Sequence, residues 1–271
     1  MKLTYLGTGA AEGVPALFCD CETCRNALSR GGRNVRTRSQ ALIDDALLID
    51  FPCDTFSHCM ARGINLSGVR HCLITHVHED HFCPQELVYL DNGFTHPAPA
   101  YGLTLYGSED VEPLLPAIER KRLRFIRVAP FVPFSAGRYT VTALKAAHST
   151  DHPYLYVVSD GETTLLYAHD TGLFPEETRA YLTAHGTRFD LVSLDCTEGA
   201  KGGLTYPTHM GLERNLLCRE WMRREGLVDE STVMVLNHFS HNGLHAGYDD
   251  FVPIAAAHGF AVSYDGMEIE R

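Results

Sequence analysis

The segment THVHEDH places four candidate metal ligands within six residues: His76, His78, Asp80 and His81. In an extended segment, residues two apart point to the same side, so His76 and His78 can share one metal ion. The chain then turns, and Asp80 and His81 can face a second ion. Imidazole and carboxylate ligands together suit zinc, manganese or iron. The alternative interpretation is a histidine-rich surface turn that binds no metal.

The other ligands of such a site have to come from distant segments, and three polar residues follow apolar runs: His148, Asp170 and His238. We expect His148 to be the third ligand of the first ion, Asp170 to bridge both ions, and His238 to be the last ligand of the second. Each of them alone can equally be a surface or capping residue. Two cations about 3.5–4 Å apart activate a bridging water and stabilise the attacking and leaving oxygens. The combined pattern therefore predicts a metal-dependent hydrolase with a binuclear site.

A second cluster, C-x-C-x-x-C, is formed by Cys19, Cys21 and Cys24. Three thiolates at this spacing can hold one zinc ion, which needs a fourth nitrogen or sulfur ligand. The N-terminus lacks the apolar segment of a secretory signal, so we expect a reducing cytoplasm, in which clustered cysteines indicate metal binding or catalysis. The alternative is three reduced, unligated thiols. The remaining cysteines are expected in or near the core: Cys53, Cys59, Cys72, Cys83, Cys196 and Cys218.

Short apolar runs separated by turn residues predict a strand-rich chain with helices spaced through it. QALIDDALLID is expected to form two strands joined at Asp44 and Asp45. Hairpin-like pairs argue against a purely parallel sheet and predict an α/β (α+β) fold of two mixed sheets with helices on the outer faces. The candidate ligands follow strands, so they can converge on one edge of the sandwich. Helices are expected near residues 84–92, 109–121, 175–185, 209–225 and 249–258.

Length and charge limit the class of protein. A chain of 271 residues with 45% hydrophobic content fits one domain, spanning residues 1–271, better than two. The formal net charge of -11 makes non-specific binding to nucleic acid a poor expectation, because that binding needs a basic field. The longest apolar stretches are shorter than a membrane span, so we expect no membrane partner.

THVHEDH, followed in order by the three strand-end residues, resembles the ligand pattern of the metallo-β-lactamase superfamily. The resemblance implies a four-layer αββα sandwich, the metallo-β-lactamase fold, with a binuclear site at one edge. It covers residues from about 70 to 240 and does not specify a substrate. The ligand sets that it implies are His76, His78 and His148 for one ion and Asp80, His81 and His238 for the other, with Asp170 bridging them.

Finer marks resemble the phosphoribosyl cyclic phosphodiesterases of the carbon–phosphorus lyase pathway. They are the opening LGTGAAEGVPALFCDCETC, the segments LDCTEG and LNHFSH, and the ending YDGMEI. This resemblance implies a phosphodiesterase that attacks a small diester, such as a phosphoribosyl cyclic phosphate, with metal-bound hydroxide. It implies two active-site ions, manganese or zinc, and one structural zinc whose fourth ligand is His241.

The same resemblance implies that His209 in YPTHMG contacts the phosphodiester and protonates the leaving oxygen, beside Asp80 as the other catalytic residue. The alternative is that His209 has no catalytic role and is only a residue at the N-terminus of a helix, after Thr208. The segment 196–208 departs from the family in its residues, and we expect it to border the substrate pocket. Whether it forms a lid is left open.

Other functions stay open at this stage. Within hydrolases they are a ribonuclease of the tRNA 3′-processing type and a lactone or thioester hydrolase; outside them, a metal-binding or redox-sensing module that uses the cysteines. The acidity of the chain and the lack of a long inserted basic arm argue against the ribonuclease. The expected partner is a small-molecule phosphodiester, and a homodimer is the oligomer that we consider.

Overall fold

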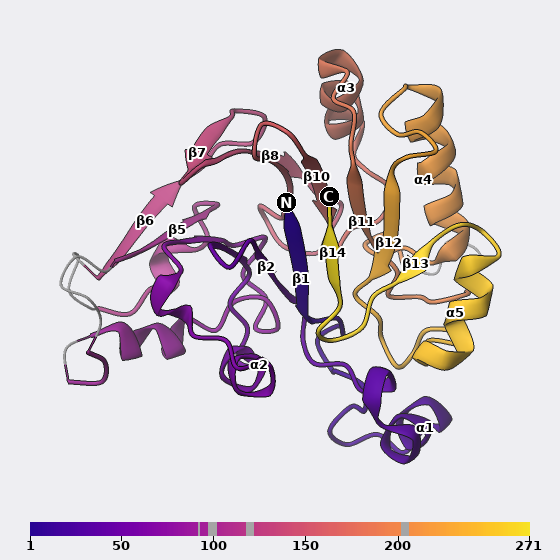
Figure 1. Ribbon diagram of the computed structural model, residues 1–271, viewed down its shortest axis with the longest axis horizontal. Coiled ribbons are helices and arrows are strands. Elements are labelled where there is room, and N and C mark those ends of the chain that lie inside the picture. The colour runs from indigo at the N-terminus through magenta and orange to yellow at the C-terminus, as the bar shows by residue number, and fades with distance from the viewer. Residues whose placement is uncertain (92, 97–101, 118–121, 202–205) are drawn as a thin grey trace.

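The computed structural model describes residues 1–91, 93–96, 102–117, 122–201 and 206–271. Within these residues the strands form two seven-stranded sheets that pack face to face, with helices on the outside (Figure 1). The chain therefore has the four-layer αββα sandwich of the metallo-β-lactamase fold that its sequence predicts.

Each sheet is mixed, with three antiparallel and three parallel neighbouring pairs among the described strands. The order in the first sheet is β14 (Glu268–Glu270), β1 (Lys2–Gly7), β2 (Gln40–Ile43), β3 (Leu47–Ile49), β4 (His71–Leu73), β5 (Leu103–Gly107) and β6 (Leu123–Arg127). The order in the second sheet is β13 (Ala261–Val262), β12 (Val233–Asn237), β11 (Leu191–Asp195), β10 (Thr164–Ala168), β9 (Tyr154–Ser159), β8 (Tyr139–Lys145) and β7 (Phe134–Ala136).

The expected hairpin at Asp44 and Asp45 is present between β2 and β3. Both residues have positive φ, 50° and 55°, as the two central residues of a type I′ turn require. The backbone N–H of Lys2 donates to Asp44 Oδ1 at 2.6 Å, which ties the turn to β1. The first sheet therefore begins with an antiparallel meander and continues with parallel strands.

The described helices are α1 (Glu22–Arg30), α2 (Thr55–Arg62), α3 (Glu176–His185), α4 (Leu212–Arg224) and α5 (Tyr248–Ala256). Short 3₁₀ helices span η1 (Gly32–Asn34), η2 (Leu66–Gly68), η3 (Pro84–Leu90) and η4 (Glu112–Leu114). The predictions for α3, α4 and α5 are confirmed within a few residues. The predicted helix at 84–92 is a 3₁₀ helix as far as it is described, and residue 92 lies outside the described residues.

The predicted helix at 109–121 is wrong in its described part, because only Glu112–Leu114 is helical there. Pro113 and Pro116 interrupt the segment, and a proline inside a helix removes a hydrogen bond and clashes with the preceding turn. Residues 118–121 lie outside the described part of the chain. The helices α1 and α2 were not predicted, since each is short and buries only two residues, which leaves few apolar positions to mark it in the sequence.

Among the described residues, three apolar clusters hold the layers together. The inner faces of both sheets meet through side chains such as Leu3, Tyr5, Val141 and Tyr156. A second cluster packs α3, α4 and α5 on the outer face of the second sheet, and a third lies under the loops on the outer face of the first sheet. Each fully buried large apolar side chain contributes about 1.5–3 kcal/mol. These clusters make the two sheets a rigid support for the loops at their edge.

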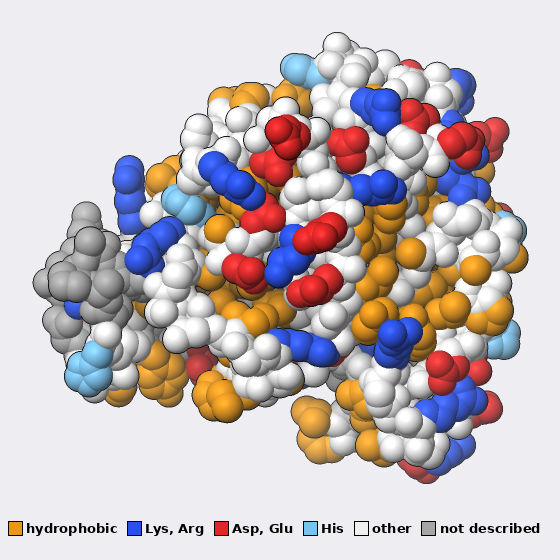
Figure 2. Space-filling view, viewed as in Figure 1, with side chains coloured by type: hydrophobic (Ala, Val, Ile, Leu, Met, Phe, Trp, Pro, Cys, Tyr) orange, Lys and Arg blue, Asp and Glu red, His pale blue; other side chains and the backbone are white. Residues whose placement is uncertain are grey.

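The described surface mixes both signs of charge on the face shown in Figure 2, where Lys and Arg side chains alternate with Asp and Glu. That face offers no extended basic field among its described residues. None of the described helices combines the length and the hydropathy that a bilayer span requires.

Candidate metal centre

The candidate ligands meet where strands of both sheets end. In the second sheet, β10, β11 and β12 run parallel, and Asp170, Asp195 and His238 lie at or just after their carboxyl ends. In the first sheet, Asp50 follows β3 and His76 follows β4, which is parallel to it. Carboxyl ends of parallel strands share one edge, where loops commonly build binding sites. The topology thus collects residues that are up to 188 positions apart.

Four ligand atoms from His76, His78, His148 and Asp170 lie within 4.8 Å of one another. His78 Nδ1 is 3.0 Å from His76 Nε2 and 3.1 Å from His148 Nε2. Two imidazole nitrogens on one tetrahedral zinc ion at 2.0–2.1 Å would be about 3.3 Å apart. The three ring nitrogens therefore have the spacing of metal ligands, and we call these four residues the first cluster.

The second cluster consists of Asp80, His81, Asp170 and His238, and its ligand atoms also lie within 4.8 Å of one another. His81 Nε2 is 2.8 Å from Asp170 Oδ2, 3.2 Å from Asp80 Oδ2 and 3.3 Å from His238 Nε2. The structure thus brings together all seven residues that the sequence predicted for a binuclear site. That they bind metal stays a prediction.

Asp170 belongs to both clusters, and its surroundings fit a bridging carboxylate. Its Oδ1 is buried and makes no well-aligned hydrogen bond among the described residues, although the Nδ1 atoms of His209 and His238 each lie 3.3 Å away. A buried carboxylate oxygen held this loosely is costly unless a cation lies against it. Although burial acts to raise it, the neighbouring His238 and His81 hold the pKa of Asp170 well below its ordinary value. Asp170 and His238 also have positive φ, 51° and 63°, a conformation that L side chains adopt rarely and mostly where the surroundings enforce it. The donor set and this loosely held oxygen therefore fit two divalent cations.

Asp50 orients one of the ligands from behind and was not predicted from the sequence. It is fully buried, and its Oδ2 lies 2.7 Å from His81 Nδ1. The backbone N–H of Thr75 donates to Asp50 Oδ1 at 2.8 Å, and the Thr75 hydroxyl lies 3.1 Å from His76 Nδ1. A carboxylate on the far ring nitrogen holds an imidazole in the tautomer and orientation that ligation requires. Its sequence signal is an acid directly after the apolar run ALLI.

A buried polar network lies behind the second cluster. The Tyr5 hydroxyl donates to Ser193 Oγ at 2.7 Å. His169 Nε2 lies 2.6 Å from this Ser193 Oγ. The Asn237 amide lies 3.1 Å from His169 Nδ1, and Ser263 Oγ donates to Asn237 Oδ1 at 2.5 Å. Both ring nitrogens of His169 are thus engaged in this network and not in the metal clusters. The network joins the ends of β10, β11 and β12, which carry ligands.

His209 lies at the open side of the clusters, and its side chain is 22% exposed. Its Nδ1 is 3.3 Å from Asp170 Oδ1 and 3.4 Å from Asp195 Oδ2. Burial acts to lower the pKa of His209, but its close contacts with these two carboxylates raise that pKa to about 10. Gly172 allows this approach, because an added Cβ there would lie 1.8 Å from the Pro207 carbonyl oxygen.

Asp195 is a second residue that sequence reasoning missed. It is fully buried, and its carboxylate accepts hydrogen bonds from the backbone N–H groups of Asp170 and Met210 at 3.1 and 2.8 Å. The hydroxyl of Thr197, in the turn after β11, lies 2.9 Å from His238 Nδ1. Asp195 and Thr197 therefore fix the loops that carry His209 and His238. As with Asp50, the only signal was an acid after an apolar run.

A cavity of about 390 Å³ opens over the clusters. Metal-cluster residues form its floor, and the predicted bordering segment contributes Thr197, Glu198, Lys201, Tyr206 and Thr208 to its walls. The expected bordering segment 196–208 therefore lies at this cavity with part of its described residues, and residues 202–205 lie outside the described part; that the cavity takes the substrate stays a prediction. The volume suits a small molecule.

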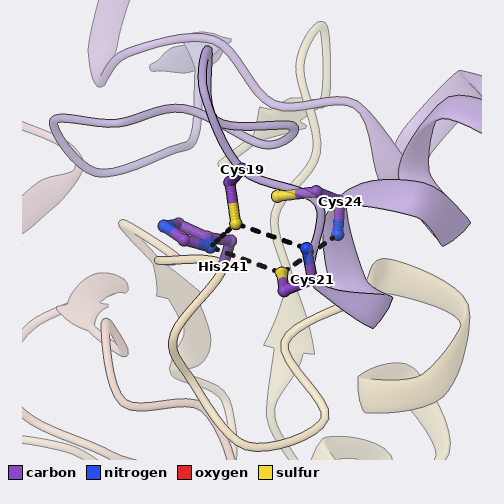
Figure 3. Close-up of side chains that lie close together, drawn as sticks. All are labelled: Cys19, Cys21, Cys24 and His241. Carbon is purple, nitrogen blue, oxygen red and sulfur yellow. Dashed lines mark hydrogen bonds between the residues drawn. The ribbon is translucent and has the colours of Figure 1, made fainter.

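The cysteine cluster forms as predicted, with His241 beside it (Figure 3). His241 Nδ1 is 3.4 Å from Cys19 Sγ and 3.5 Å from Cys21 Sγ, close to the spacing of about 3.5 Å for nitrogen and sulfur on one tetrahedral zinc. Burial acts to raise the pKa of Cys21, but hydrogen bonds from His241 and from the Cys24 backbone N–H lower that pKa to about 6. Burial raises the pKa of Cys24 to about 12. The donor set fits one zinc ion.

The other cysteines agree only partly with the expectation of a core position. Cys72, Cys196 and Cys218 are buried, and Cys59 and Cys83 are half-buried. The prediction for Cys53 is wrong, because its side chain is exposed at the start of the turn before α2.

Comparison with known proteins agrees with this geometry. Residues 48–238 match a family model described as a beta-lactamase superfamily domain. The structure is similar to a diphosphatase of the PhnP family (21% identity, 99% of this chain and 96% of that chain, TM-score 0.74). It is also similar to zinc-bound PqqB from Methylobacterium extorquens (17% identity, 100% of both chains, TM-score 0.76) and to the short form of human tRNase Z (15% identity, 100% of this chain and 99% of that chain, TM-score 0.62).

A curated relative, the octanoyltransferase of Porphyromonas gingivalis, is 38% identical over 86 residues. That match spans 30% of this chain and 16% of the relative. The chain thus spans only a small part of that protein's length.

Proposed function

The chain belongs to the beta-lactamase superfamily, and from this premise we propose that it is a metal-dependent phosphodiesterase with a binuclear centre. The observation that carries the proposal is Asp170, whose carboxylate is shared by both ligand clusters and keeps a buried oxygen without a well-aligned hydrogen bond. His76, His78 and His148 would hold one ion, and Asp80, His81 and His238 the other. Two bound divalent cations supply an activated water and neutralise charge on the phosphoryl oxygens.

The residues of the chain perform the remaining work in this proposal. Asp50 and Thr197 keep His81 and His238 oriented through their far ring nitrogens. His209 faces the cavity beside the clusters, where it can donate a proton to the leaving oxygen. Lys201 lines the same cavity and can attract an anionic diester. Together they favour a small anionic ester over a neutral lactone.

The proposed substrate is a small diester, with a phosphoribosyl cyclic phosphate as the leading candidate. The cavity volume and the fold shared with a PhnP-family diphosphatase support this choice. The fold shared with tRNase Z keeps precursor tRNA as the alternative. The active-site ions are proposed as manganese or zinc, and the compartment as the cytoplasm.

A substrate panel tests the reaction class. Protein reconstituted with Mn²⁺ would be assayed on bis(p-nitrophenyl) phosphate, on a precursor tRNA, on a homoserine lactone and on a glutathione thioester. We expect turnover of the diester and none of the other three. Cleavage of the lactone or thioester with no turnover of the diester would refute the phosphodiesterase proposal, and preferred cleavage of the tRNA would replace the small diester by RNA.

A further inference from the structure

The cavity has a second wall, which lies away from its metal-cluster floor and includes Glu12. Glu12 sits in a turn in which the Gly13 N–H donates to the Ala10 carbonyl at 2.9 Å. Gly13 has φ of 70°, so the turn depends on glycine at that position. The Glu12 side chain is 35% exposed, which leaves its carboxylate accessible from the cavity.

One oxygen of Glu12 is held by three consecutive side chains of the loop after β12. Ser240 Oγ donates to Glu12 Oε1 at 2.8 Å, and Asn242 Nδ2 donates to it at 3.2 Å. His241 Nε2 lies 3.5 Å from the same oxygen. All these contacts among the described residues fall on Oε1, so Oε2 stays available to a ligand. A carboxylate held in this way is oriented before a ligand arrives.

The same loop connects Glu12 to both candidate metal sites. His238 belongs to the second cluster, while the other ring nitrogen of His241 faces the cysteine thiolates. Two backbone hydrogen bonds, from Ala10 N to Phe239 O and from Phe239 N to Thr8 O, both 3.0 Å, connect the loop after β1 to the loop after β12. The position of Glu12 relative to the binuclear site is therefore set by the chain itself. A carboxylate behind a zinc-binding histidine also orients that ring.

The charge of Glu12 indicates what it contacts. A carboxylate oxygen only accepts hydrogen bonds and repels phosphate, so Glu12 must face another part of the substrate. Its ligand is then a hydroxyl or an ammonium group. Lys201 lines the same cavity and makes it less favourable for a second cation, whereas a hydroxyl can donate to Glu12 and accept from Lys201 or Asn242. These neighbours favour hydroxyl groups.

We propose that Glu12 determines specificity by accepting a hydrogen bond from a sugar hydroxyl, such as a free hydroxyl of ribose, on the organic part of the diester. This inference rests on the proposed phosphodiesterase function and assigns one residue of the pocket to one part of the substrate. It also gives the N-terminal cysteine loop a role in substrate recognition, since that loop carries Glu12.

The test compares two diesters that differ only in the diol: the p-nitrophenyl esters of uridine 5′-phosphate and of 2′,3′-dideoxyuridine 5′-phosphate. In Glu12→Gln the amide oxygen can keep the Ser240 contact, while the free acceptor becomes a donor. A hydrogen bond to a charged group contributes roughly 10- to 100-fold. We expect kcat/KM to fall by about that factor on the diol substrate, through KM, and to stay unchanged on the dideoxy substrate.

Glu22→Gln is the matched control, because Glu22 is an exposed residue of α1 that does not line the cavity. It should behave as the wild type on both substrates. Calorimetric binding of uridine 5′-monophosphate and its dideoxy form gives a readout besides turnover, and only the former should weaken in Glu12→Gln.

An equal loss on both substrates, or no loss on either, would overturn the assignment. A loss confined to p-nitrophenyl phosphorylcholine would overturn it in favour of an ammonium ligand. If the wild type cleaves no diester at all, the proposed function fails; calorimetry with the two nucleotides then decides on Glu12 by itself.

Discussion

Replacing Asp50 by Asn is expected to weaken metal binding at the second cluster and to leave the first cluster intact. Asp50 Oδ1 accepts from the Thr75 N–H, and its Oδ2 lies 2.7 Å from His81 Nδ1. Asn has only one oxygen. If that oxygen stays with Thr75, the amide NH₂ faces His81 Nδ1 and can only donate to it. The ring proton must then move to Nε2, the atom that faces Asp80 and Asp170, and a protonated nitrogen cannot bind a cation.

The magnitude follows from this single contact. Loss of an oriented partner behind a metal-binding histidine typically reduces metal affinity about 10- to 100-fold, which is roughly 1.4–2.7 kcal/mol. The side chain is fully buried and nearly the same size in both forms, so the fold should persist. Calorimetric titration of the metal-free protein with Mn²⁺, a cation that thiolates bind weakly, measures the two active-site ions without filling the cysteine cluster. We expect one of the two binding steps to weaken.

Asp45→Asn is the matched control. Asp45 is 68% exposed in the β2–β3 turn, and Asn tolerates its positive φ. This variant should titrate as the wild type does. Two unchanged binding steps in Asp50→Asn would refute the orientation argument, and circular dichroism of both variants separates that outcome from unfolding.

Three further changes have defined outcomes. Cys21→Ser should remove one tightly held zinc equivalent and leave the other two, as counted by mass spectrometry of the native protein; three retained equivalents would contradict the assignment. Ser193→Ala leaves the Tyr5 hydroxyl and His169 Nε2 without this partner in the core and should cost roughly 1–3 kcal/mol in urea unfolding, with a negligible change counting against the network. Burial lowers the pKa of His58 to about 4 in the folded protein, below the pKa of the same side chain in the unfolded chain. As the pH falls, His58 is therefore protonated in the unfolded chain before it is protonated in the folded protein. Stability should therefore fall between about pH 6.5 and 4, by up to about 3 kcal/mol, and His58→Gln should flatten that slope in pH-dependent unfolding; an unchanged slope would refute it.

The ligand residues could be predicted from the sequence because they combine a dense motif with strand ends. His76 and His78 are close in the chain, and Asp170 and His238 each follow an apolar run. Asp50 follows such a run too, but its role behind His81 depends on β3 and β4 pairing in parallel. The parallel pairing of β3 and β4 is a feature of the tertiary structure that no local sequence pattern indicates.

Other parts of the site were beyond the sequence for different reasons. Glu12 is an acid in a turn, and only the loop after β12 shows that it is held against the cavity. The short helix α1 starts at Glu22, directly after Cys21 caps it, so its position reflects the cysteine cluster as much as helical periodicity. The wrong helix at 109–121 shows the opposite error, in which apolar spacing was given more weight than Pro113 and Pro116.

The central claim is that the two clusters joined by Asp170 form one catalytic centre for phosphodiesters. The most direct measurement is the rate of bis(p-nitrophenyl) phosphate hydrolysis while Mn²⁺ is titrated into metal-free protein, for the wild type and for Asp80→Ala. We predict that turnover rises to its maximum only as the second equivalent binds and that it is lost in the variant. Full turnover with one equivalent, or turnover retained in Asp80→Ala, would contradict the account.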